Sequence, residues 1–168
     1  MSDQSTKNLA EAFAGESQAN RRYLAFAEKA EEDGFPNIAR LFRAVAESET
    51  IHAINHLKAM GGIKTTLENV EEALQGEKDE VSGMYPMFMD QAKRDSNNDA
   101  LTSFYWANEA EIEHGDFFEK AVNALKDGGD LELGDVYICS VCGYTVEGEP
   151  PEKCPTCNQP KDKFEIVK

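Results

Sequence analysis

The chain has 168 residues, 40% of them hydrophobic, and a formal net charge of −15. This length suits one ordinary domain with at most a small appendage, and the charge argues against nucleic acid or an anionic membrane surface as a partner. No apolar run approaches the roughly 20 residues of a membrane span, and the first residues show no signal-peptide pattern. We therefore expect a cytoplasmic protein.

The first half of the sequence predicts two long helices. Helical periodicity runs over residues 6–33 and again over residues 36–60. Pro36 is a favoured first residue of a helix, and it follows a glycine that can end the helix before it. The pair Gly61-Gly62 ends the second segment. The two segments are long enough to form a helical hairpin.

The following stretch predicts two more helices. After a linker with a short helical piece near residues 67–75, a third segment runs over 77–95. It contains Pro86, which predicts a kink or a break. A fourth segment runs over 99–127, with Asp99 as its expected N-cap. The sequence thus contains four long helical segments in all.

The helical part repeats itself. The stretch "ESETIHA" (47–53) matches "EAEIEHG" (109–115) in two glutamates and one histidine, 62 positions later. At the same offset Phe42 corresponds to Phe104, and Tyr23 to Tyr85. Two helix pairs of similar design predict a four-helix bundle built from duplicated hairpins.

Carboxylates and imidazoles lie in line with the apolar residues of these helices. Glu49 and His52 are one turn apart, as are Glu111 and His114. Two further glutamates, Glu16 and Glu77, lie on the stripes of the first and third segments. Unpaired buried carboxylates each cost several kcal/mol, and the stripes carry no lysine or arginine. Protonation or cation binding must compensate.

Metal binding explains the spacing best. A single Glu-x-x-His is common by chance and usually marks a solvated face. Here it occurs twice, in internal repeats, with a matching glutamate on each of the other two helices. One glutamate from each of two helices and Glu-x-x-His from the other two is the ligand set of dimetal carboxylate bundles. Glutamate and imidazole ligands suit iron or manganese.

The composition changes after residue 134. The last 34 residues are rich in proline, glycine and cysteine, and they predict short strands and turns. They cannot bury a stable core alone, so a structural metal is expected to supply the missing folding energy. All four cysteines lie here, as two C-x-x-C pairs separated by eleven residues: Cys139, Cys142, Cys154 and Cys157. This spacing predicts a tetrahedral site for zinc or a single iron.

Together these motifs resemble rubrerythrin. The resemblance covers nearly the whole chain and rests on "AFAGESQA", "ESETIH", "GEKDEVSGMYP", "EAEIEH" and "CSVCGY…CPTCN". It implies a mainly helical fold, with a ferritin-like four-helix bundle over residues 1–134 and a rubredoxin-like β domain over 135–168. It also implies an oxo- and carboxylate-bridged di-iron site in the bundle and an Fe(Cys)4 site in the tail, where zinc is a possible substitute.

The resemblance further implies an activity and the residues that perform it. The activity is reduction of hydrogen peroxide to water, in protection against oxidative stress. The electrons come from NAD(P)H through separate reductases and carriers such as rubredoxin. Glu49 and Glu111 would bridge the irons, while His52 and Glu80 would exchange as ligands of one iron. The implied di-iron ligands are Glu16, Glu49, His52, Glu77, Glu80, Glu111 and His114.

Other features complete the prediction. Tyr23 and Tyr85 each have a hydroxyl that could form a hydrogen bond with a ligand carboxylate.

Asn158 stands where rubredoxins usually have glycine. A small effect of this difference on the cysteine-bearing fold is expected, because asparagine tolerates left-handed backbone. The linker near residues 128–135 is short, so the tail is expected to serve the bundle of a neighbouring subunit. A homodimer or larger oligomer is therefore expected, as the resemblance also implies. The alternative is a ferritin-like ferroxidase or iron-handling protein with a structural zinc-ribbon tail.

Overall fold

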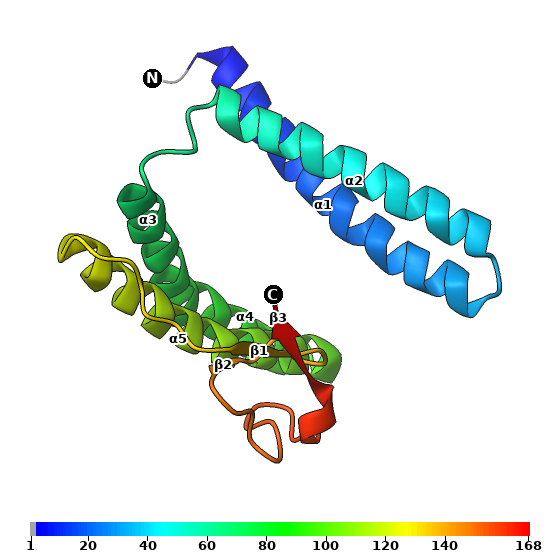
Figure 1. Cartoon of the computed structure of the whole chain (residues 1–168). Helices are drawn as coiled ribbons and strands as arrows, with labels where there is room; N and C mark the ends of the chain where they lie inside the picture. Colours follow the sequence, from blue (N-terminus) through cyan, green and yellow to red (C-terminus); the bar gives the residue numbers. More distant parts are fainter. Residues whose placement is uncertain (1–2) are drawn as a thin grey trace. The chain divides into compact units, whose positions relative to one another are not determined.

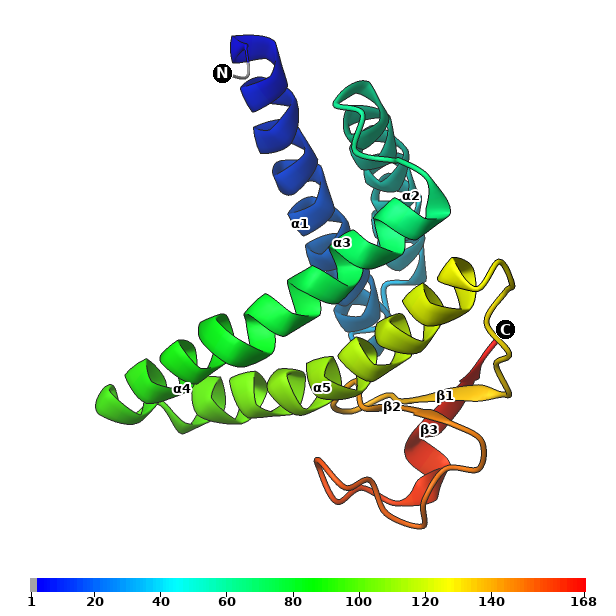
Figure 2. The same cartoon turned by 90° about the vertical axis from the view of Figure 1, so that its left-hand side faces the viewer.

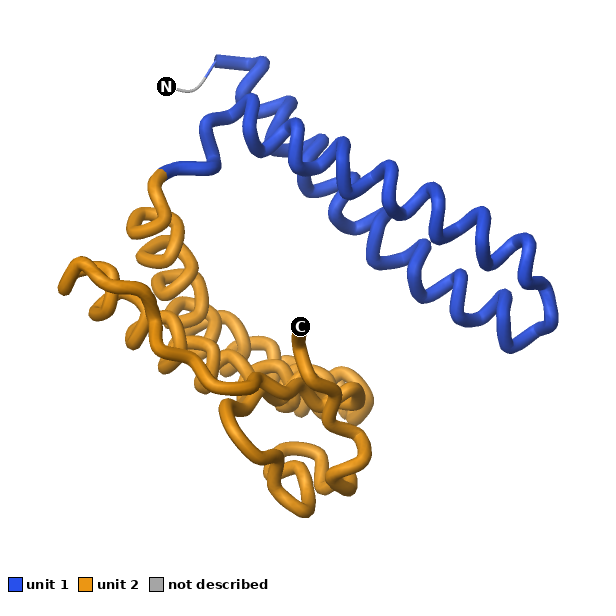
Figure 3. Tube along the Cα trace, viewed as in Figure 1, with its two compact units in different colours: residues 1–64 blue, residues 65–168 orange. Residues whose placement is uncertain are grey.

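The computed structural model describes residues 3–168 and consists of two compact units (Figure 3). The first ends at Lys64 and the second begins at Thr65. The first unit is a helical hairpin, and the second combines a helical hairpin with a small sheet (Figure 1). No helix within residues 3–168 is both long and apolar enough to cross a membrane. The predicted class, mainly helical with a small cysteine-bearing β part, is confirmed.

The first unit contains helices α1 (Gln4–Glu32) and α2 (Pro36–Ala59). Asp3 caps α1, because its carboxylate accepts a hydrogen bond from the backbone N–H of Thr6 at 2.8 Å. Pro36 occupies the first turn of α2, as predicted. Both predicted segments are confirmed to within two residues at each end.

Helices α1 and α2 pack through small residues. The buried positions of α2 are Ala39, Ala46 and Ala53, a strict seven-residue repeat. Such a repeat keeps one narrow seam turned towards a neighbouring helix. Asn20 of α1 is buried at this seam, and its Nδ2 donates to the carbonyl oxygen of Ala46 at 2.7 Å and to Oγ1 of Thr50 at 2.8 Å. The larger apolar residues of α2 therefore lie off the seam.

The second unit begins with one long helix in three parts. These are α3 (Thr66–Asp79), the π-helical segment η1 (Glu80–Met84) and α4 (Tyr85–Arg94). Helix α5 (Asn98–Lys126) packs against all three. The prediction of a separate short helix at 67–75 was wrong, because α3 is continuous through that stretch. Its start is fixed by a capping box between Thr65 and Glu68.

A π-helical turn accommodates Pro86, where the sequence predicted a kink or break. The backbone N–H of Tyr85 donates to the carbonyl oxygen of Glu80, five residues back instead of four. Proline has no N–H to donate and crowds the preceding turn, and the wider turn accommodates this without ending the helix. The turn also brings Tyr85 within electrostatic reach of the Glu80 carboxylate. The N-cap prediction for α5 was wrong, since Asn97 accepts the capping hydrogen bond from Ala100 at 3.1 Å, and Asp99 lies inside the helix.

The chain ends in a three-stranded antiparallel sheet of order β2-β1-β3. Its strands are β1 (Val136–Cys139), β2 (Thr145–Glu147) and β3 (Phe164–Val167), with a 3-10 turn η2 (Lys161–Lys163) before β3. The sheet lies beside α5, and β2 contacts that helix (Figure 2). The cysteine-bearing part is thus docked on the second helical hairpin.

The internal repeat is visible in the packing of aromatic rings. Tyr23 and Phe42 pack across the first hairpin with ring centroids 6.0 Å apart. Tyr85 and Phe104 pack across the second hairpin at 6.4 Å. The two hairpins therefore use equivalent aromatic pairs at equivalent positions, as the sequence offset of 62 predicted.

Candidate metal centres

Within residues 3–168, three groups of side chains bring metal-ligating atoms within 4.8 Å of one another. We name them the α1–α2 cluster (Glu16, Glu49, His52), the α3–α5 cluster (Glu77, Glu111, His114) and the cysteine cluster (Cys139, Cys142, Cys154, Cys157). All of these residues were predicted as ligands from the sequence. Each cluster lies within one of the two units.

The α1–α2 cluster has an open side. Nδ1 of His52 lies 2.9 Å from Oε2 of Glu49. The Glu49 side chain is 15% exposed, whereas that of His52 is 51% exposed. Nε2 of His52 lies 3.5 Å from the hydroxyl of Ser48, one turn back on the same helix, which is too long for a strong hydrogen bond. The imidazole is therefore only loosely held.

The α3–α5 cluster is more enclosed. Nδ1 of His114 lies 2.6 Å from Oε2 of Glu111, and the two side chains are 30% and 17% exposed. The other ring nitrogen of His114, Nε2, lies 3.0 Å from the hydroxyl of Thr145 on strand β2. Glu77 reaches the cluster from α3, opposite Gly115 of α5. This imidazole is therefore held from both sides.

Carboxylates crowd one another in the α3–α5 cluster. Burial, a hydrogen bond with Glu111 and the negative charges of Glu111 and Glu80 raise the pKa of Glu77 to about 7. Burial and the charge of Glu111 also raise the pKa of Glu80, against an opposing effect of His114. A bound cation would relieve this repulsion. The donor set of carboxylate oxygens and one imidazole nitrogen therefore fits iron or manganese.

The two predicted tyrosines differ in their surroundings. Burial, followed by the charges of Glu80, Glu111 and Glu77, raises the pKa of Tyr85. Tyr85 therefore lies among the carboxylates, where the π-helical turn places it. Tyr23 packs its ring against Phe26 and Phe42. Hydrogen bonding of either hydroxyl to a ligand carboxylate stays a prediction.

The cysteine cluster has the spacing of a tetrahedral site. Sγ of Cys139 lies 3.7 Å from that of Cys157, and Sγ of Cys142 lies 3.5 Å from that of Cys154. Metal–sulfur bonds of ~2.3 Å in a tetrahedron place sulfurs about 3.8 Å apart, whereas a disulfide needs about 2.05 Å. All four cysteines are free thiols. They therefore fit a tetrahedral metal ion.

Burial raises the pKa values of these thiols, whereas hydrogen bonds from nearby backbone N–H groups lower them. Burial opposes the ionisation of Cys139, but hydrogen bonds from the backbone N–H groups of Val141 and Cys142 outweigh it and lower its pKa. Burial raises the pKa of Cys142 and of Cys157. A metal ion would stabilise all four as thiolates.

Two equivalent turns hold the cysteines. The N–H of Gly143 donates to the carbonyl oxygen of Cys139, and that of Asn158 donates to the carbonyl oxygen of Cys154, both at 2.9 Å. Both turn residues adopt left-handed backbone, with φ of +82° and +59°. Asn158 thus adopts the conformation that the sequence predicted for it.

Two contacts dock the cysteine-bearing segment on α5, and neither was predicted. Tyr144 lies within electrostatic reach of Glu113: burial, followed by the charges of Glu113 and Cys154, raises the pKa of Tyr144. The neighbouring Thr145 makes the contact with His114 described above. Tyr144 belongs to the first cysteine motif, but the sequence does not indicate the partners of either residue, because their pairing depends on packing between distant segments.

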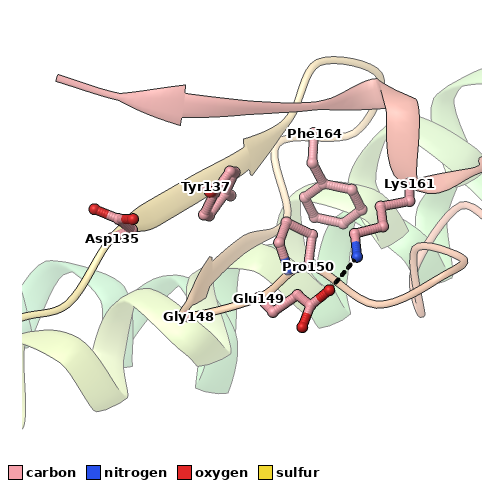
Figure 4. Close-up of a pocket in the computed structure, with 7 residues that line it drawn as sticks. All are labelled: Asp135, Tyr137, Gly148, Glu149, Pro150, Lys161 and Phe164. Carbon is pink, nitrogen blue, oxygen red and sulfur yellow. Dashed lines mark hydrogen bonds and ion pairs between the residues drawn. The ribbon is translucent and has the colours of Figure 1, made fainter.

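The second unit contains several open clefts, and two of them lie near charged side chains. One of about 310 Å³ is lined by Glu77 and Glu111 together with the apolar Val81 and Ile112. The other, of about 560 Å³, lies in the β part beside the ion pair of Lys161 and Glu149, whose Nζ and Oε1 are 2.6 Å apart (Figure 4). Its lining contains none of the cluster residues. Of these two clefts, the first therefore reaches candidate metal ligands.

Comparison with known proteins decides the family. The sequence model of rubrerythrin matches residues 7–122, and that of the rubrerythrin rubredoxin-like domain matches residues 137–165. The chain belongs to the rubrerythrin family. It is 39% identical to rubrerythrin-2 of Clostridium acetobutylicum, over 94% of this chain and 93% of that protein. It is 37% identical to nigerythrin of Nitratidesulfovibrio vulgaris, over 94% of this chain and 84% of that protein.

Solved structures agree with this assignment. Nigerythrin in a partially reduced state superimposes with a TM-score of 0.56 at 34% identity, covering 99% of this chain and 88% of that one. Nigerythrin in its fully reduced, all-ferrous state superimposes with a TM-score of 0.55, at the same identity and coverage. Rubrerythrins carry a di-iron site and an Fe(Cys)4 site, and this chain has the carboxylate–histidine clusters and the cysteine cluster for both.

The structure brings the predicted ligands together in part. Glu16, Glu49 and His52 meet in one unit, while Glu77, Glu111 and His114 meet in the other, with Glu80 beside them. The assignment of all seven side chains to one di-iron centre stays a prediction, as does the domain boundary between residues 134 and 135.

The left-handed turn at Asn158 predicts an unequal response to substitution. Replacing Asn158 by valine should lower the free energy of unfolding by about 1–2 kcal/mol relative to replacing it by glycine, because a β-branched residue is strained at positive φ. Guanidinium unfolding of the metal-loaded protein, followed by the absorbance of the cysteine site, measures this. Equal stability of the two variants would contradict it.

The raised pKa of Glu77 predicts a pH dependence of the metal-free protein. The folded state holds the Glu77 proton more tightly than the unfolded chain, so the free energy of unfolding should fall as pH rises from about 4.5 to about 7. Urea unfolding at several pH values measures this slope. Glu77→Gln should make the slope shallower, whereas Glu47→Gln, at an exposed site, should not. A slope unchanged by Glu77→Gln would refute the assignment.

Proposed function

We propose that this protein is a rubrerythrin-type peroxidase that reduces hydrogen peroxide to water. The observation that carries the proposal is the combination, on one chain, of two carboxylate–histidine clusters with a cysteine cluster docked on the helix that bears His114. Rubrerythrins are generally peroxide-reducing oxidoreductases, which supports the assignment. Storage of iron needs no built-in cysteine site.

The seven predicted ligands would hold the metal. Glu16, Glu49 and His52 supply one half of the set, and the α3–α5 cluster with Glu80 supplies the other. Two irons bound there would supply the two electrons that cleave the O–O bond of peroxide. The carboxylates neutralise the cationic charge, and their crowding in the absence of a cation favours metal binding.

Reduction of peroxide to two waters also consumes two protons. Burial and the charge of Glu111 raise the pKa of Glu80 in the metal-free chain, and a cation bound at the site would lower it again. Tyr85 follows Glu80 across the π-helical turn, and the charge of Glu80 acts on its hydroxyl. We propose that Glu80, when it is not ligating iron, has a second role as a proton carrier to the leaving oxygen.

Electrons must return after each turnover. A role of the cysteine cluster in this step is supported by the proximity of Tyr144 to Glu113 and by the contact of Thr145 with His114 of α5. Rubrerythrins take electrons from redox partners, and we propose rubredoxin or an NAD(P)H-dependent reductase as the donor here. Free thiols at all four cysteines suit a reducing compartment such as the cytoplasm.

We further propose that the chain forms a homodimer or larger homo-oligomer. Large apolar side chains of the first unit are about half exposed: Phe26 48%, Ile38 47%, Leu41 59% and Ile51 53%. Exposed apolar side chains of this size on a helical hairpin indicate a surface that another helical surface covers. Association with a second copy would bury them.

The proposed activity predicts a preference between oxidants. The reduced, iron-loaded protein mixed anaerobically with hydrogen peroxide should oxidise at least about tenfold faster than with an equal concentration of dioxygen. Stopped-flow absorbance measures both rates. Oxidation by dioxygen at the same or a higher rate would refute the peroxidase and favour a ferroxidase.

The two roles of Glu80 predict the effect of its removal. Glu80→Ala should retain iron but lower the rate of peroxide turnover by about 100-fold or more, the usual loss when a general acid is removed. Metal analysis and steady-state assays on the same sample measure both quantities. The matched control is Asp79→Ala, at an exposed neighbouring carboxylate, which should leave turnover near that of the wild type. Unchanged turnover in Glu80→Ala would exclude both roles.

A further inference from the structure

One hydrogen bond joins helix α5 to strand β2, and its direction is fixed. Oγ1 of Thr145 lies 3.0 Å from Nε2 of His114 and 3.1 Å from the carbonyl oxygen of Gly143. A carbonyl only accepts, so the single hydroxyl proton of Thr145 is directed to Gly143. Oγ1 therefore accepts from His114, which donates its Nε2–H.

This direction selects one form of the imidazole. A neutral histidine carries one N–H, so a proton on Nε2 leaves Nδ1 with a free lone pair. Nδ1 of His114 faces Oε2 of Glu111 at 2.6 Å. At that distance Nδ1 and the carboxylate share either a second ring proton, which Nδ1 donates to Glu111, or a metal ion that takes the place of this proton. Nδ1 is therefore the nitrogen that His114 presents to a metal ion.

We propose that Thr145 is a positioning residue that holds His114 in place as an Nδ1 metal ligand. Ligand histidines generally donate their other N–H to a fixed acceptor, which sets the tautomer and the ring orientation. Here that acceptor comes from the cysteine-bearing segment. The inference rests on the ligand set of the proposed function, but it is independent of which oxidant the protein reduces.

The position of Thr145 depends in turn on the first cysteine turn. Thr145 pairs with Ile138 across strands β1 and β2. Gly143, which receives its hydroxyl hydrogen bond, donates its own N–H to the carbonyl oxygen of Cys139 at 2.9 Å. The fold around the cysteine cluster thus sets the orientation of a ligand in the α3–α5 cluster.

The other repeat provides an internal reference. His52 is the counterpart of His114, and its Nε2 lies 3.5 Å from the hydroxyl of Ser48 on its own helix. The His52 side chain is 51% exposed, against 30% for His114. Removal of the Ser48 hydroxyl should therefore matter much less than removal of the Thr145 hydroxyl.

Metal affinity tests the proposal directly. The full-length protein is prepared with zinc in the cysteine site, and Co²⁺ is titrated into the carboxylate–histidine sites by visible absorbance. Thr145→Val keeps the shape of the side chain but removes the hydroxyl, and it should weaken Co²⁺ binding about 10–100-fold. Thr145→Ser should restore affinity to within about threefold of wild type, and Ser48→Ala should leave it near wild type. Equal affinity of wild type and Thr145→Val would overturn the proposal.

A second measurement starts from the wild-type protein, and this part of it does not depend on how the variants fold. The chain has three histidines, so long-range ¹H–¹⁵N correlation spectra of the fully zinc-loaded wild type can assign each ring. His114 should show a metal-bound Nδ1 and a protonated Nε2, and Thr145→Val should lose this signature while Thr145→Ser keeps it. Metal bound at Nε2 in the wild type would overturn the proposal. Loss of peroxide activity with these signatures intact would instead refute the proposed function alone.

Discussion

The repulsion among carboxylates in the α3–α5 cluster is the constraint on which the rest of the site depends. Glu77, Glu80 and Glu111 approach one another at a partly buried surface, and the pKa of Glu77 rises to about 7 as a result. Such an arrangement is unfavourable for the folded chain alone, because negative charges are brought together and partly desolvated. A cation converts the same arrangement into a binding site. The cost in the metal-free protein therefore favours metal binding.

The π-helical turn shows how the backbone serves this site. A regular helix could not continue unchanged into Pro86, and the wider turn at Glu80–Met84 solves that problem. The same turn carries Glu80, and Tyr85 follows it within electrostatic reach of Glu80, Glu111 and Glu77. A local response to proline thus contributes a carboxylate and a phenol to the cluster, in keeping with the frequent occurrence of π-turns at functional sites.

The two Glu-x-x-His motifs match in sequence but differ in their surroundings. His114 is held by Glu111 on one side and by a strand of the cysteine-bearing segment on the other. His52 is half exposed: its Nδ1 lies 2.9 Å from Glu49, but its Nε2 has a long contact of 3.5 Å to Ser48 on its own helix. A histidine fixed at both nitrogens keeps one position, whereas a loosely held one can move. The duplicated hairpins therefore supply one rigid ligand and one adaptable ligand, which suits a site that changes oxidation state.

The sequence by itself determined the first two and the last of the helical segments, the two Glu-x-x-His pairs and the cysteine turns, because each depends on spacing within one stretch of the chain. Glu49 and His52 meet because they are one turn apart, and Asn158 adopts left-handed backbone because its turn requires it. Only the tertiary structure decided that α3 runs unbroken into a π-helical turn and that Asn97 caps α5. It also decided that Thr145 reaches His114. That contact joins residues 31 positions apart, and its existence depends on how a sheet packs against a helix, which periodicity along the chain does not encode.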